Sequence, residues 1–161
     1  MSDEEIKTIT KDLHLFLSLI SKDKSLLSID YGTKKTGIAI SDPEQKISLP
    51  LCTILENDQN ALVSKIYELI SRKKIGGIVI GLPLTQDNKN ASITEKAEAL
   101  AIKLASKDNI VLLYDERFSS KAARNLLKAY GISQSSIRET NDQIAASMML
   151  AEILESTRSP K

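Results

Sequence analysis

The chain has 161 residues, of which 42% are hydrophobic and 27% charged, and its 22 basic and 21 acidic side chains leave a formal net charge of +1. These values are typical of one ordinary globular domain, and they exclude general disorder, collagen-like repeats and coiled coils. Because the net charge is close to zero, any affinity for nucleic acid depends on local basic patches and not on a field from the whole molecule.

The first predicted element is an amphipathic helix over residues 5–20, where apolar residues recur at helical spacing. Polar residues 21–25 then form a linker into the first strand. We therefore divide the chain into an N-terminal amphipathic helix and linker, residues 1–24, and a main domain, residues 25–161.

Three predicted strands follow, at about residues 26–31, 37–41 and 47–55. A short turn with glycine at both ends joins the first two, so we expect them to pair antiparallel. Pro50 interrupts the third strand, and a proline in a strand is tolerated best at the edge of a sheet.

Helices and strands then alternate along the chain. Helices are predicted at about 58–73, 91–107, 120–130 and 141–156, and strands at 75–81 and 109–115. The crossovers make the first, fourth and fifth strands parallel. The predicted fold class is therefore α/β, with a mixed sheet flanked by helices.

Acidic residues gather at one predicted end of this sheet. Ligands of such sheets bind beyond the carboxyl ends of the parallel strands, where Asp30, the loop at 81–84 and the pair Asp115-Glu116 lie. Carboxylates held close together repel one another unless a divalent cation compensates them, and oxygen ligands suit Mg²⁺ or Mn²⁺. Asp142 opens the final helix and would complete a site of three carboxylates, an arrangement that suits phosphodiester hydrolysis.

Four motifs, DYGTKKTGIAISD, VIGLPLTQDN, YDERFSS and NDQIAASMMLAEIL, resemble those of the YqgF/RuvX family in order and spacing, over roughly residues 26–156. The resemblance implies a ribonuclease H-like fold with a five-stranded mixed sheet of order 3-2-1-4-5. It implies a bacterial cytoplasmic nuclease that matures the 5′ end of pre-16S ribosomal RNA, with Holliday-junction resolution as the other activity. It also implies that Asp30, Glu116 and Asp142 are the catalytic metal ligands, with Mg²⁺ or Mn²⁺ as the cofactor.

Three acidic assignments have alternatives. Successive strand residues face opposite sides of a sheet, so Asp115 and Glu116 reach one metal equally well only if the strand has already ended. Which of these two binds the metal therefore stays open. Asp142 also fits a helix start with a capping box, and Asp30 also fits a strand-end acid that hydrogen-bonds the following turn.

Basic and polar side chains near the acids are candidate contacts for a nucleic-acid substrate. They are Lys34, Lys35, Thr85, Arg117, Lys121 and Arg124. Lysine clusters commonly form a solvated surface, and Arg117 is equally suited to pairing with its acidic neighbours. As phosphate contacts, these cations would make binding sensitive to salt.

Cysteine and histidine usage excludes several other kinds of site. Cys52 is the only cysteine, which leaves no internal disulfide and no cysteine-rich metal site, and we expect it to pack in the core. His14 is the only histidine and is expected at the surface, so a Ser-His-Asp relay has no support. No secretory signal or membrane span is recognisable, and we expect a cytoplasmic protein.

Two other functions stay open. An actin-like phosphotransferase would use DYGTKKTG as a phosphate loop, but that architecture needs two such domains and this chain has room for one. A protein of the same fold that binds nucleic acid without cleaving it also fits the near-neutral charge. The expected partner is nucleic acid, with an rRNA precursor favoured over branched DNA, and the expected assembly is a monomer or a homodimer.

Overall fold

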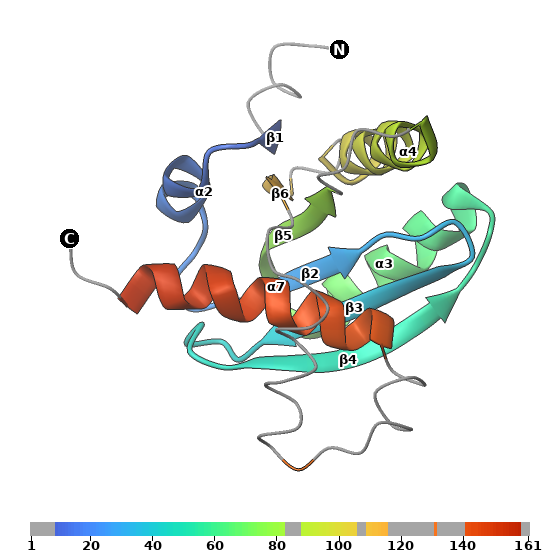
Figure 1. Cartoon of the computed structure of the whole chain (residues 1–161). Helices are drawn as coiled ribbons and strands as arrows, with labels where there is room; N and C mark the ends of the chain where they lie inside the picture. Colours follow the sequence, from blue (N-terminus) through green and yellow to red (C-terminus); the bar gives the residue numbers. More distant parts are fainter. Residues whose placement is uncertain (1–8, 83–87, 106–108, 116–130, 132–140, 159–161) are drawn as a thin grey trace.

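The computed structural model describes residues 9–82, 88–105, 109–115, 131 and 141–158. Its centre is a six-stranded sheet with the order β1-β6-β5-β2-β3-β4 (Figure 1). The strands are β1 (Ile9–Thr10), β2 (Ser25–Asp30), β3 (Lys35–Ser41), β4 (Ser48–Leu55), β5 (Ile75–Leu82) and β6 (Val111–Asp115). The helices are α2 (Leu13–Leu19), α3 (Gln59–Lys73), α4 (Asn88–Ala105) and α7 (Asn141–Arg158).

The helices cover the two faces of the sheet and create two buried clusters. Side chains of α3 and α4 pack with one set of strand residues, and side chains of α2 and α7 pack with the alternate set. In Figure 1, α7 lies across β2, β3 and β4 on the side opposite α3. Among the described residues, no helix combines the length and the apolar run that a membrane span requires.

The predicted strand order is confirmed for five of the six strands. β4, β3, β2, β5 and β6 correspond to the predicted order 3-2-1-4-5, with β2, β5 and β6 parallel and the two hairpin pairs antiparallel. β4 lies at an edge, as Pro50 indicated. The helix predicted at 120–130 lies outside the described residues.

The sixth strand corrects the prediction for the N-terminal segment. Residues 9–10 were expected within a helix, but they form β1, which extends the sheet by pairing parallel with β6. The helix begins at Leu13, because the Asp12 carboxylate accepts hydrogen bonds from the backbone N–H groups of His14 and Leu15 and so caps α2. Helical spacing of apolar residues alone does not reveal a cap inside the pattern.

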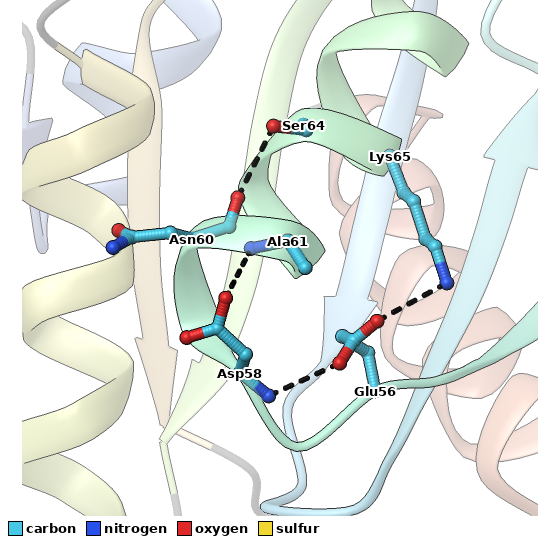
Figure 2. Close-up of polar contacts among 6 residues, drawn as sticks. All are labelled: Glu56, Asp58, Asn60, Ala61, Ser64 and Lys65. Atoms are coloured by element: carbon cyan, nitrogen blue, oxygen red, sulfur yellow. Dashed lines mark hydrogen bonds and ion pairs between the residues drawn. The ribbon is translucent and has the colours of Figure 1, made fainter.

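Polar contacts at the start of α3 join the helix to the segment that precedes it (Figure 2). The Asp58 side chain caps the helix by accepting from Ala61 N at 3.0 Å. Glu56 accepts from Asp58 N at 3.2 Å and from Lys65 Nζ at 3.3 Å, and these hydrogen bonds, the one from Asp58 first, lower the pKa of the Glu56 carboxyl. The Glu56 N–H in turn donates to the Lys34 carbonyl at 3.1 Å, so the segment between β4 and α3 is hydrogen-bonded to the turn between β2 and β3.

Candidate active site

Asp30 is the last residue of β2 and faces the side of the sheet that α7 covers. Ser28, two residues earlier, is fully buried and donates from Oγ to the Ala146 carbonyl of α7 at 2.9 Å. Because residues two apart in a strand share a face, Asp30 projects toward the same side. It is partly exposed, as an acid at the end of a buried strand needs to be if it is to reach a ligand.

Gly37 brings the start of α7 next to Asp30. Gly37 pairs with Asp30 across the β2–β3 ladder. A Cβ atom built on Gly37 would overlap the Asp142 carbonyl group and lie 2.6 Å from Gln143 N, so only glycine permits this close approach. The structure therefore places the backbone of Asp142 beside Gly37, the residue that pairs with Asp30, although the two acids are far apart in the sequence.

Side chains from the sheet hold α7 in this position. Gln143 Nε2 donates to Thr53 Oγ1 at 3.2 Å, beside the first turn of the helix. One turn further on, Ser48 Oγ donates to the Ser147 carbonyl at 2.7 Å. Asp142 lies in the first turn of α7, where a negative charge also interacts favourably with the helix dipole.

Asp115 lies further from Asp30 and has the opposite orientation in its strand. It is the exposed last residue of β6, which is separated from β2 by β5. Val111 and Leu113 pack in the cluster with α3 and α4. Because alternate residues of a strand share a face, Asp115 belongs to the face of the sheet that these helices cover, opposite the face of Asp30. The strand geometry therefore does not favour Asp115 as a ligand beside Asp30. Glu116, the other member of the acidic pair, lies outside the described residues.

The complete three-carboxylate site stays a prediction. Within the described ranges, no three His, Cys, Asp or Glu residues are grouped closely enough to hold a metal ion. The two acids that lie in those ranges, Asp30 and Asp142, supply oxygen ligands of the kind that Mg²⁺ and Mn²⁺ prefer. The backbone of Asp142 approaches the strand pair that carries Asp30, and the donor chemistry of these two acids fits a divalent cation.

Two of the six candidate substrate contacts lie in the described structure. Lys35 begins β3 two residues before Gly37, is exposed, and belongs to the face that carries Asp30. Lys34 is exposed in the hairpin turn and lines a shallow hollow of about 340 Å³ with Leu55, Glu56 and Asn57. Thr85, Arg117, Lys121 and Arg124 lie outside the described residues.

The only cysteine and the only histidine take no part in this site. His14 is exposed on α2, as expected. Cys52 is half-buried in β4 against the cluster with α3 and α4, and burial raises the pKa of its thiol. The residues that sequence reasoning missed are Gly37 and Gln143, because their roles depend on which strand lies under α7. A glycine inside a strand is the one signal that pointed to a close approach.

Comparison with known proteins identifies the family. The sequence model described as "RuvX: Holliday junction resolvase" matches residues 24–156. The chain belongs to the RuvX family. Proteins named "Putative pre-16S rRNA nuclease" from Rickettsia peacockii and Rickettsia canadensis are 36% and 37% identical over 151 residues, which cover 93% of this chain and 98% of theirs.

Solved structures of resolvases share the fold of this RuvX-family chain. T. thermophilus RuvC in complex with a Holliday junction substrate is 12% identical, with a TM-score of 0.55 over 84% of this chain and 96% of that one. Fowlpox virus resolvase in complex with Holliday junction DNA is 14% identical, with a TM-score of 0.50 over 84% and 99%. The ribonuclease H-like fold class is therefore confirmed, and family membership makes the chain a hydrolase of the nuclease type.

Proposed function

We propose that this chain is a divalent-metal-dependent nuclease that cleaves phosphodiester bonds in structured RNA and processes the 5′ end of pre-16S rRNA. The observation that carries the proposal is the contact at Gly37, which joins the Asp30 strand end to the acidic first turn of α7. The names of the Rickettsia relatives, which match nearly the whole chain, favour rRNA as the substrate. Such a substrate is found in the cytoplasm, which is the location that we infer.

Different residues of the chain have different roles in the proposed hydrolysis. Asp30 and Asp142, with Glu116 as the third ligand, would hold Mg²⁺ or Mn²⁺, which activates water and stabilises the charge on the leaving oxygen. Because β2 is buried and hydrogen-bonded to α7, the backbones that carry Asp30 and Asp142 need not move when the substrate binds. Lys35, on the same face, would bind a phosphate of the RNA backbone.

The test is the substitution Asp30→Asn, assayed by Mg²⁺-dependent cleavage of a pre-16S rRNA fragment. We expect turnover to fall by more than about 100-fold, because the partners that merely orient metal ligands are already worth 10–100-fold. EDTA should abolish cleavage by the unmodified protein, and added Mg²⁺ or Mn²⁺ should restore it. Asp23→Asn is the matched control, since Asp23 is exposed in the linker before the other end of β2.

Three outcomes would contradict parts of this proposal. If the protein cuts a four-way DNA junction and leaves the rRNA fragment intact, the resolvase activity in the family's description is the function. Undiminished rRNA cleavage by Asp30→Asn would show that Asp30 is not a catalytic metal ligand. RNA affinity without products in either metal would instead favour a protein that binds and does not cleave.

A further inference from the structure

A row of backbone positions runs across the sheet from Asp30 to Tyr114. In the parallel ladders Ile29 pairs with Ile80, and Gly81, the next residue of β5, pairs with Tyr114. Asp30 is therefore level with Gly81 and Tyr114. Neighbouring strands lie about 4.8 Å apart, so the backbones of Tyr114 and Asp30, which are two strands apart, are separated by about 10 Å. Gly81 adds no side chain between them.

Tyr114 faces the same side of the sheet as Asp30. It packs against the buried cluster that contains Leu112 and the apolar side chains of α7, and it remains partly exposed. Asp30 shares this side through its strand neighbour Ser28, which hydrogen-bonds α7. The aromatic ring and the candidate catalytic acid thus belong to one face and one row.

A groove of about 330 Å³ opens beside Tyr114. Among the described residues, its lining comes from three parts of the chain, with Lys11, Leu13, Tyr114, Asp115 and Glu152. The volume is at the lower end of the range for small-ligand sites. An aromatic ring, a cation and acceptor oxygens are the groups that bind the base, the phosphate and the sugar of a nucleotide.

Lys11 supplies the positive charge of this groove from outside the family match. It lies between β1 and α2, whereas the family model begins at residue 24. Its side chain is exposed, and within the described part of the chain no ion pair engages its ammonium group. The N-terminal segment therefore brings a cation to the end of β6, where the carboxylates of Asp115 and Glu152 would otherwise repel a phosphate.

We propose that this groove binds one nucleotide of single-stranded RNA next to the cleavage position, with its base on Tyr114 and its phosphate on Lys11. Glu152 only accepts hydrogen bonds when it is ionised, which suits a ribose hydroxyl or a base amino group and not a second phosphate. The proposal rests on the proposed function, because the nuclease site at Asp30 defines the cleavage position. It gives the N-terminal segment a role in substrate binding.

The test is a fluorescence-anisotropy titration of a single-stranded RNA of about 12 nucleotides, a length within the usual range of single-strand sites. All variants of the full chain carry Asp30→Asn, so that cleavage does not disturb binding. Tyr114→Leu should weaken binding about five-fold or more, and Tyr114→Phe should leave it unchanged, because stacking needs the ring alone. Lys11→Ala should lower the slope of log affinity against log salt by about one.

Lys73→Ala is the matched control, since Lys73 is an exposed lysine at the end of α3, on the opposite face. If Lys11→Ala and Tyr114→Leu bind the RNA as Lys73→Ala does, or if the parent protein binds no RNA, the nucleotide site does not exist. Lys11 is exposed, so this variant decides the question even if Tyr114→Leu fails to fold. Cleavage by the unmodified protein, measured separately, shows whether the proposed nuclease function stands when the subsite fails.

Discussion

Cys52 is a residue outside the candidate site whose chemistry the fold changes. It lies in the edge strand β4 with part of its side chain against the core, and burial raises the pKa of its thiol. A higher pKa means that a smaller fraction of the side chain is thiolate at neutral pH. Because the thiolate is the nucleophile, Cys52 should be a poor target for thiol reagents.

We expect Cys52 to react with a disulfide reagent such as DTNB more slowly in the folded protein than in the protein unfolded by denaturant. The rate should continue to rise with pH above 9.0, the ordinary value for the thiol, because ionisation in the folded protein occurs later. Stopped-flow absorbance between neutral and alkaline pH measures both rates. Equal rates in the folded and unfolded chains would contradict the burial argument.

At the scale of single residues, the sequence predicts those residues whose role depends on their neighbours in the chain. Asp30 could be recognised because a charge at the end of an apolar run needs a partner. Gly37, Gln143 and Tyr114 could not, because each acquires its role from strand register or from the path of α7. Glu116 follows from the family resemblance, and its place in the site stays a prediction.

Among the elements, α7 determines the geometry of the candidate site. It crosses the sheet closely because small side chains lie beneath it and on its inner surface. Ala39 and Ala146 are fully buried in the cluster that α7 shares with the sheet, and Gly37 contacts the first turn of the helix directly. A side chain added under that turn must displace the helix, since protein interiors are close-packed.

We expect Gly37→Ala to reduce nuclease activity by more than its loss of stability explains. The new methyl group would push Asp142 away from Asp30, and overpacking of this kind typically costs about 1–3 kcal/mol. Gly76→Ala is the control, because its Cβ would lie 2.9 Å from Lys24 Cβ, where β5 begins and far from the site. Urea unfolding gives the stability of each variant, and rRNA cleavage at a temperature where both are folded gives the activity. Equal activity in the two variants would show that α7 does not position a catalytic group.

The helices and strands also show where sequence patterns are sufficient to predict secondary structure. Each predicted helix or strand in the described main domain is present, with ends that differ by a few residues, because its apolar period and its glycine or proline breaks are local signals. β1 was missed because two residues are too short for a periodic signal. Their strand conformation comes from the partner β6, which is about 100 residues away in the sequence.

For the whole molecule, the parallel direction of the first, fourth and fifth predicted strands could be predicted from the crossovers, and the strand order could be predicted from the family resemblance. The packing of the N-terminal segment could not. Phe16 is fully buried and Ile20 is 7% exposed, both in the cluster with α7. A Cβ atom on Gly77 would lie 2.8 Å from Phe16 Cζ and 2.7 Å from Ile20 Cγ2, so this glycine of β5 makes room for α2.

The domain boundary that the sequence predicts at residue 24 is therefore best tested by measuring the free energy of unfolding. We expect Phe16→Ala to lower the free energy of unfolding by about 3–5 kcal/mol, since a fully buried aromatic side chain leaves a cavity. Leu15→Ala, whose leucine is 46% exposed, should change stability by only about 0.5 kcal/mol or less. Urea unfolding followed by circular dichroism measures both. If Phe16→Ala were as stable as Leu15→Ala, residues 25–161 would form a domain that is stable without α2. The expected loss would instead show that α2 shares one core with the nuclease sheet, and that Lys11 is held at the end of β6 by the same packing.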